Sequence, residues 1–200
     1  MKPKIFSDAD RKQLLRIARE SIHAGLHNKA YSPETPSPPL TLERGVFVTL
    51  KHRGELRGCL GRFESDGIPL ARLIAVMAME SARHDFRFSP VALVELPEID
   101  IQISVLTPLE PVKDISEIVI GEHGLQIRGR AGGGMHRSGT LLPQVASEHR
   151  WDVTTFLNAT CTKAGLPQNA WKDPQTEIFK YGAEVFGDLD FAQPPFHVDE

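Results

Sequence analysis

The chain has 200 residues, of which 40 % are hydrophobic and 24 % are charged, and its formal net charge is −3. This composition is typical of a globular protein that can bury a core, and the negative balance gives no general attraction to nucleic acid or to acidic membranes. No apolar run is long enough to cross a bilayer, the N-terminus lacks an apolar signal core, and the two cysteines are too few for a disulfide framework or a cysteine-rich zinc site. We therefore expect a cytoplasmic protein with neither a nucleic acid nor a membrane as partner.

The N-terminal segment predicts a packing helix followed by a loop. Ser7 and Asp10 have the spacing of a capping box, with Asp in place of the usual Glu. Apolar residues then recur at helical spacing as far as Gly25, where the helix is expected to end. Residues 31–44 contain four prolines, and this density excludes a regular helix or a central strand.

A β-hairpin is predicted next, with strands at 46–51 and 56–61 and a tight turn at 53–54. Its second strand carries the sequence around which the chain is organised. Strict alternation puts two groups on opposite faces of that strand: Leu56, Gly58 and Leu60, and Arg57, Cys59 and Gly61. The leucines are expected to face a core, so the other face would present a guanidinium and a thiol.

Two interpretations of Arg57 and Cys59 remain open at this point. Their side chains would lie roughly 6.6 Å apart along the strand, so that the fixed positive charge could favour a thiolate. Alternatively, Cys59 is simply a small buried residue, as free cysteines often are. Gly58 and Gly61 weaken a strand, and their usual justification is the close approach of a ligand or of another backbone.

The segment from Pro69 to His84 predicts an apolar helix that is buried on more than one side. His84, Asp85 and Arg87 form a polar cluster where this helix ends. They could cap the helix, or they could line the site that holds Cys59.

The second half of the chain alternates short strands and helices. Expected in order are strands at 100–106, 125–130 and 137–142, a helix at 143–148, a helix capped by Asp152 and stopped by Gly165, and a final strand at 178–186. Cys161 lies on the apolar stripe of the second helix and is expected in a core. Hairpins and short connections indicate an α+β fold, with an antiparallel sheet and flanking helices.

Several segments in order resemble the AMMECR domain family, also called AmmeMemoRadiSam system protein A. The resemblance rests on 45–50 (GVFVTL), 57–61 (RGCLG), 85–90 (DFRFSP), 96–101 (LPEIDI), 139–145 (GTLLPQV) and 163–171 (KAGLPQNAW). Two departures are small: Leu60 replaces a usual Ile, and Phe86 replaces a common Pro.

The resemblance implies a larger α+β domain built from both chain ends, at 1–110 and 175–200, and a smaller inserted α+β subdomain at 111–174. It implies that the Arg-Gly-Cys motif faces a cleft between them, where small-molecule sites usually lie. It also implies a functional association with Memo-type and radical SAM proteins.

The leading hypothesis is an enzyme or substrate-handling component that acts on an unknown small molecule. Cys59 would be the nucleophile or redox group, and Arg57 its activator and anion anchor. His84, His136 and His149 are candidate general bases, and the candidate binding residues are Leu56, Gly58, Gly61, Asp85 and Arg87. No metal site is assigned and the cofactor is unknown. The alternative is a non-catalytic interaction or scaffold protein in which the motif is structural.

Overall fold

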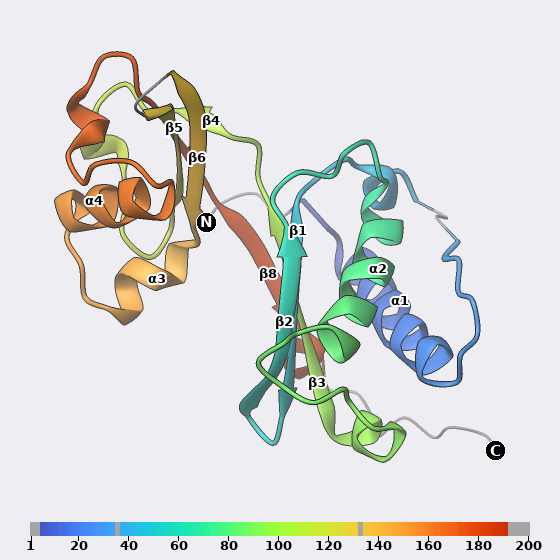
Figure 1. The fold of residues 1–200 in the computed structure, drawn as a ribbon. Helices are drawn as coiled ribbons and strands as arrows, with labels where there is room; N and C mark the ends of the chain where they lie inside the picture. The colour runs from blue at the N-terminus through green and yellow to red at the C-terminus, as the bar shows by residue number, and fades with distance from the viewer. Residues whose placement is uncertain (1–4, 35–36, 132–133, 192–200) are drawn as a thin grey trace. The chain divides into compact units, whose positions relative to one another are not determined.

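The computed structural model describes residues 5–34, 37–131 and 134–191, and it has the predicted α+β fold with antiparallel sheets (Figure 1). The α-helices are α1 (Asp8–Leu26), α2 (Leu70–Arg83), α3 (Pro143–Glu148) and α4 (Val153–Lys163). The strands are β1 (Val46–His52), β2 (Glu55–Arg62), β3 (Ile99–Leu106), β4 (Glu110–Pro111), β5 (Gly124–Ala131), β6 (Met135–Leu141), β7 (Glu177–Tyr181) and β8 (Ala183–Gly187). Among the described residues, no helix is both long and apolar enough to cross a membrane.

The chain divides into two compact units, one formed by 1–106 with 184–200 and the other by 107–183. Each unit has its own sheet and its own buried cluster of apolar side chains. The domain boundaries expected from the resemblance, and the cleft with them, stay predictions.

The first unit places two helices on one face of a four-stranded sheet in the order β2-β1-β3-β8. In Figure 1, α1 and α2 lie together on one side of β1, β2 and β3. The apolar alternation of β1 explains this arrangement, because Val46, Val48 and Leu50 are fully buried in the core that both helices share. The capping box of Ser7 and Asp10 is present at the start of α1, as predicted.

The hairpin of β1 and β2 contains a bulge that the sequence pattern does not reveal. Lys51 pairs with Leu56 and Leu50 pairs with Gly58, so Arg57 is an extra residue without a partner on β1. A bulge breaks the alternation of the strand. Leu56 lies opposite Lys51, on the face away from the buried Leu50, and is 42 % exposed. The prediction that Leu56 faces the core is therefore wrong.

The second unit contains the sheet β4-β7-β5-β6 with α3 and α4. Helix α3 has the predicted bounds, and α4 begins after Asp152, whose side chain accepts a hydrogen bond from the Thr155 N–H. Gly165 follows α4 with a φ of 71°, which suits a glycine at a helix stop. Leu125, Ile127 and Phe156 belong to the buried cluster of this unit.

The predicted last strand at 178–186 is wrong, because the structure has two strands there. β7 pairs with β5 in the second sheet, and β8 lies beside β3 in the first. Gly182 lies between them, and its N–H donates to the Thr107 hydroxyl rather than to a neighbouring strand. A continuous run of strand-forming residues does not show that the chain changes sheets.

Cys161 is fully buried in the second core, as expected, and burial raises the pKa of its thiol. We expect Cys161→Ala to lower the free energy of unfolding by about 1 kcal/mol, because the smaller side chain leaves a cavity. Urea denaturation followed by circular dichroism measures this loss. A variant as stable as the natural protein would contradict the buried placement of the thiol.

Candidate functional site

Cys59 lies on β2 with its thiol on the sheet face away from α1 and α2. It is the register partner of Thr49, and the Thr49 hydroxyl donates a hydrogen bond to the Cys59 Sγ over 3.2 Å. Thr49 alternates with the buried Val48 and Leu50, which fixes the face. The side chain of Cys59 is free and half-buried. This position gives the thiol a hydrogen-bond donor in a residue that is only partly buried.

The backbone of Cys59 is held from outside the sheet by a carboxylate and a guanidinium. β2 is an edge strand, so one side of its backbone has no neighbouring strand. The Cys59 N–H donates to Asp85 Oδ2 over 2.8 Å, and the Cys59 carbonyl accepts from Arg87 Nη2 over 3.2 Å. Asp85 and Arg87 therefore satisfy the two backbone groups that another strand would pair.

The Asp85–Arg87 pair is itself tightly bound. Arg87 Nε and Nη2 donate to the two oxygens of Asp85 over 2.9 Å and 2.6 Å, in the fork geometry typical of an arginine and a carboxylate. The side chain of Asp85 is 2 % exposed, whereas that of Arg87 is 44 % exposed. The hydrogen bond from Arg87 holds the pKa of Asp85 far below its ordinary range, although burial works in the opposite direction.

A second arginine–carboxylate pair holds the side chain of Arg57. Arg57 Nε and Nη2 donate to the two oxygens of Glu95 over 2.8 Å and 3.0 Å, and Nη1 donates to the Ser89 carbonyl over 2.8 Å. The hydrogen bond from Arg57 lowers the pKa of Glu95. The guanidinium of Arg57 is thus engaged by residues of the segment 85–95, which also supplies Asp85 and Arg87. Two of the segments that carry the resemblance, 57–61 and 85–90, meet along this edge of β2.

The glycines of the motif are explained by close packing within the first unit. A Cβ atom on Gly58 would lie 2.2 Å from the Ser81 carbonyl oxygen on α2, and one on Gly61 would lie 2.4 Å from the Val46 carbonyl oxygen. The side-chain hydroxyl of the same serine accepts from the Leu60 N–H and donates to the Val48 carbonyl, each over 2.8 Å. Another stretch of backbone approaches each of these glycines closely.

The candidate histidines are spread over the molecule. His84 follows α2 and is 62 % exposed, and its Nδ1 lies 3.1 Å from Glu80 Oε2. His136 lies on β6 in the second unit, and the ring of His149 stacks on Trp151 at 4.8 Å. The side-chain hydrogen bonds that reach Cys59 in the described part of the chain come from Thr49, Asp85 and Arg87, so no histidine is assigned as a base.

Sequence reasoning does not single out Thr49, Ser81 or Glu95. A hairpin with a two-residue turn and no bulge pairs Thr49 with Gly58, and the bulge moves it opposite Cys59. Within 5–34, 37–131 and 134–191, no three or more His, Cys, Asp or Glu side chains are grouped so that they could hold a metal ion.

Comparison with known proteins gives consistent matches along the chain. The AMMECR1 family model matches residues 15–186. A protein from Methanothermobacter thermautotrophicus is 38 % identical over 93 % of this chain and 98 % of its own length, and one from Methanopyrus kandleri is 42 % identical over 86 % of each chain. The crystal structure of an uncharacterized protein from Pyrococcus horikoshii superposes with a TM-score of 0.75 at 36 % identity, covering 92 % of this chain and 94 % of the other.

Proposed function

The chain belongs to the AMMECR1 family, and we propose that it handles a small molecule through the thiol of Cys59, on the face of the first sheet away from α1 and α2. The observation that carries this proposal is the combination of a free, half-buried thiol with a backbone fixed by Asp85 and Arg87. Besides satisfying the free edge of β2, this fixation holds the thiol in one position. Rigid placement of a reactive atom is what catalysis and covalent binding require.

In this proposal Cys59 is the nucleophile and its neighbours have distinct roles. The Thr49 hydroxyl donates to Sγ and so fixes the direction in which the sulfur points. Arg87 lies beside Cys59, whose carbonyl accepts from its Nη2. Asp85 is a positioning residue, because it orients Arg87 and the Cys59 backbone without reaching the thiol.

Arg57 has a different place in the proposal from the one its spacing suggests. Its donors are already bound by Glu95 and by the Ser89 carbonyl, so it could anchor an anion only by releasing them. We therefore propose that Arg57 fixes the bulge and the segment 85–95, while Asp85 and Arg87 hold the backbone of Cys59. The association with Memo-type and radical SAM proteins stays a prediction from the resemblance.

Alkylation of Cys59 by iodoacetamide tests the proposal, in protein that carries Cys161→Ala so that one thiol remains. We expect Cys59 to react in the folded protein, and we expect Thr49→Val to slow the reaction, because the donor that holds Sγ in place is lost. Mass spectrometry after a series of reaction times measures the rate. The low-molecular-mass fraction of a cell extract should also protect Cys59.

Thr41→Val is the matched control for this experiment. Thr41 belongs to the first unit, and its hydroxyl donates to the Pro38 carbonyl rather than to a sulfur. The control should leave the alkylation rate unchanged. A folded protein in which Cys59 never reacts, or a rate that Thr49→Val does not alter, would overturn the proposal.

A second candidate function, a non-catalytic interaction protein, is favoured by exposed apolar side chains in the same region. Phe86 is 93 % exposed and Val94 is 84 % exposed, and both belong to the segment that binds β2. Large exposed apolar side chains often mark a surface that meets another protein. An inert Cys59 would make this function the leading one.

A further inference from the structure

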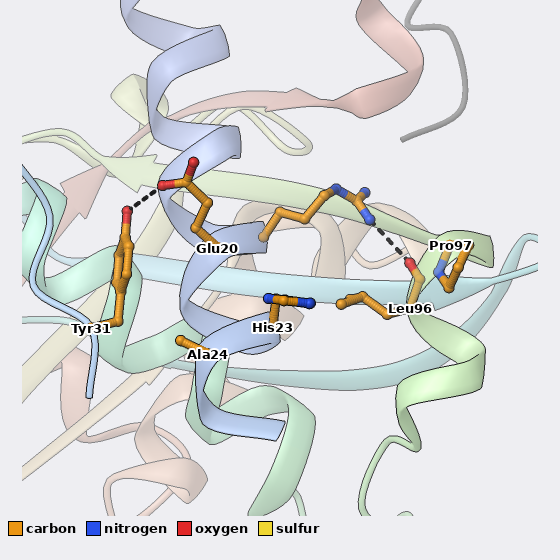
Figure 2. Close-up of a pocket in the computed structure, with 7 residues that line it drawn as sticks. Glu20, His23, Ala24, Tyr31, Leu96 and Pro97 are labelled. Carbon is orange, nitrogen blue, oxygen red and sulfur yellow. Dashed lines mark hydrogen bonds between the residues drawn. The ribbon is translucent and has the colours of Figure 1, made fainter. Parts of the chain in front are cut away.

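A pocket in the first unit lies outside the Cys59 site and has no role in the proposed function. Its volume is about 310 Å³, at the small end of the range for ligand sites. The lining residues come from α1, from the loop that follows it and from the segment before β3: Arg19, Glu20, His23, Ala24, Tyr31, Leu96 and Pro97. Figure 2 shows Tyr31 and Leu96 on opposite sides of His23. A ligand here would lie across α1 and contact mainly apolar atoms.

The guanidinium of Arg19, which lines the pocket, is hydrogen-bonded to other groups of the protein. Arg19 Nη1 donates to the Leu96 carbonyl over 3.0 Å, and Nη2 donates to the Ile99 carbonyl over 2.8 Å and to the Asp188 carboxylate. Its side chain is only 14 % exposed, and the charge of Asp188 balances its own. Arg19 therefore shapes the wall of the pocket and offers little attraction to an anion.

The other polar groups of the lining favour a ligand that donates hydrogen bonds. The Tyr31 hydroxyl donates its proton to Glu20 Oε2 over 2.8 Å, as Figure 2 shows, which leaves its oxygen able to accept. Burial, together with this bond to Glu20, raises the pKa of Tyr31, and so the hydroxyl keeps its proton. Glu20 can accept more bonds than it makes, because a carboxylate has about four lone-pair sites. Glu34 also acts on Tyr31 with its negative charge.

We propose that this pocket binds a small organic cation: an amine with an apolar or aromatic body. The ammonium group would donate to the Glu20 carboxylate and the Tyr31 oxygen, and the body would lie against Ala24, Leu96 and Pro97. Arg16 opposes this binding, because its Nε donates to Glu20 Oε1 over 2.6 Å. Its side chain is 64 % exposed, so this pair is a weak competitor that solvent screens.

Benzylamine, benzyl alcohol and benzoate make a matched set of probes, because they share one ring and differ in charge. Proton NMR of the His23 ring reports binding, since His23 lies in the pocket whichever probe occupies it. We expect benzylamine to bind more tightly than benzyl alcohol, and benzoate to bind least. Titration of each probe against the natural protein measures the dissociation constants.

Two charge variants should change benzylamine affinity in opposite directions. Glu20→Gln removes the negative charge but keeps an acceptor for Tyr31, and it should weaken benzylamine by about tenfold while leaving benzyl alcohol nearly unchanged. Arg16→Gln removes the competing cation and should strengthen benzylamine by about twofold. A purely structural effect of either variant would not distinguish the charged probe from the neutral one.

Ala24→Leu should fill the pocket and abolish the binding of both benzylamine and benzyl alcohol. Ala9→Leu is its control, because Ala9 is an exposed residue near the other end of α1 and receives the same side chain. Circular dichroism checks that both variants fold. If Ala24→Leu does not fold, the two charge variants still test the proposal. The proposal is overturned if no probe shifts His23, if benzoate binds as tightly as benzylamine, or if Glu20→Gln leaves benzylamine binding unchanged.

Discussion

Asp85→Asn is expected to lower the free energy of unfolding by about 3 kcal/mol at pH 7, because it breaks a buried ion pair from its buried side. The carboxylate is 2 % exposed and accepts hydrogen bonds from the Cys59 N–H and from the backbone and side chain of Arg87. A carboxamide can accept at its oxygen, but its NH₂ group would face donors. Urea denaturation of both proteins measures the loss.

The same variant should alter the dependence of stability on acid. The pKa of Asp85 is far below its ordinary range in the folded protein, so the folded state holds fewer protons than the unfolded state between the two pKa values. Its stabilising contribution is therefore complete above about pH 4, the ordinary value in an unfolded chain, and is lost progressively as the pH falls below it. We expect the difference in stability between the natural protein and Asp85→Asn to narrow between about pH 4 and pH 2.

Glu98→Gln is the matched control for Asp85→Asn. Glu98 also accepts a hydrogen bond from an arginine, Arg53, over 2.7 Å, but its side chain is 49 % exposed and that of Arg53 is 74 % exposed. Exposed pairs of this kind contribute little because water and salt screen them. Equal losses in the two variants, or a difference that stays constant in acid, would show that the buried pair does not stabilise the edge of β2 as we infer.

Local patterns in the sequence predict most of the secondary structure of this fold. The capping box at Ser7, the N-cap at Asp152 and the stop at Gly165 each involve residues within a few positions of one another, and the structure has all three. The hairpin turn is likewise local, because Arg53 and Gly54 both adopt positive φ values. Signals of this range depend little on the rest of the chain.

The candidate site is predicted less completely because long-range contacts assemble it. Cys59 and Asp85 are 26 positions apart, and Arg57 and Glu95 are 38 positions apart. The polar cluster after α2 is visible in the sequence. Whether it caps the helix or binds β2 depends on the unpaired backbone groups at the edge of the sheet, which the sequence does not reveal. The bulge at Arg57 is likewise invisible, since its effect is to move Leu56 out of the core and to bring Thr49 opposite Cys59.

Gly58 offers the sharpest distinction between a structural and a ligand-binding role for the motif. A Cβ atom at this position would lie 2.2 Å from the Ser81 carbonyl oxygen, and real Cβ contacts of this length essentially never occur. The atom it meets is backbone within α2, so no change of side-chain rotamer can relieve the clash. Either β2 or α2 must move, and the two hydrogen bonds of the Ser81 hydroxyl to β1 and β2 depend on their present separation.

We therefore expect Gly58→Ala to lower the free energy of unfolding by about 3 kcal/mol, at the upper end of the usual cost of overpacking. Gly182→Ala is the control: the nearest atom to its added Cβ is 3.6 Å away, at Thr107, and its φ is not in the left-handed region. The control should change stability by no more than about 0.5 kcal/mol. Denaturation curves decide between the two roles of Gly58, because a glycine required only by a ligand would leave Gly58→Ala as stable as the natural protein. In that event the contact between β2 and α2 would not be what demands glycine, and the ligand would have to approach the backbone at Gly58 itself.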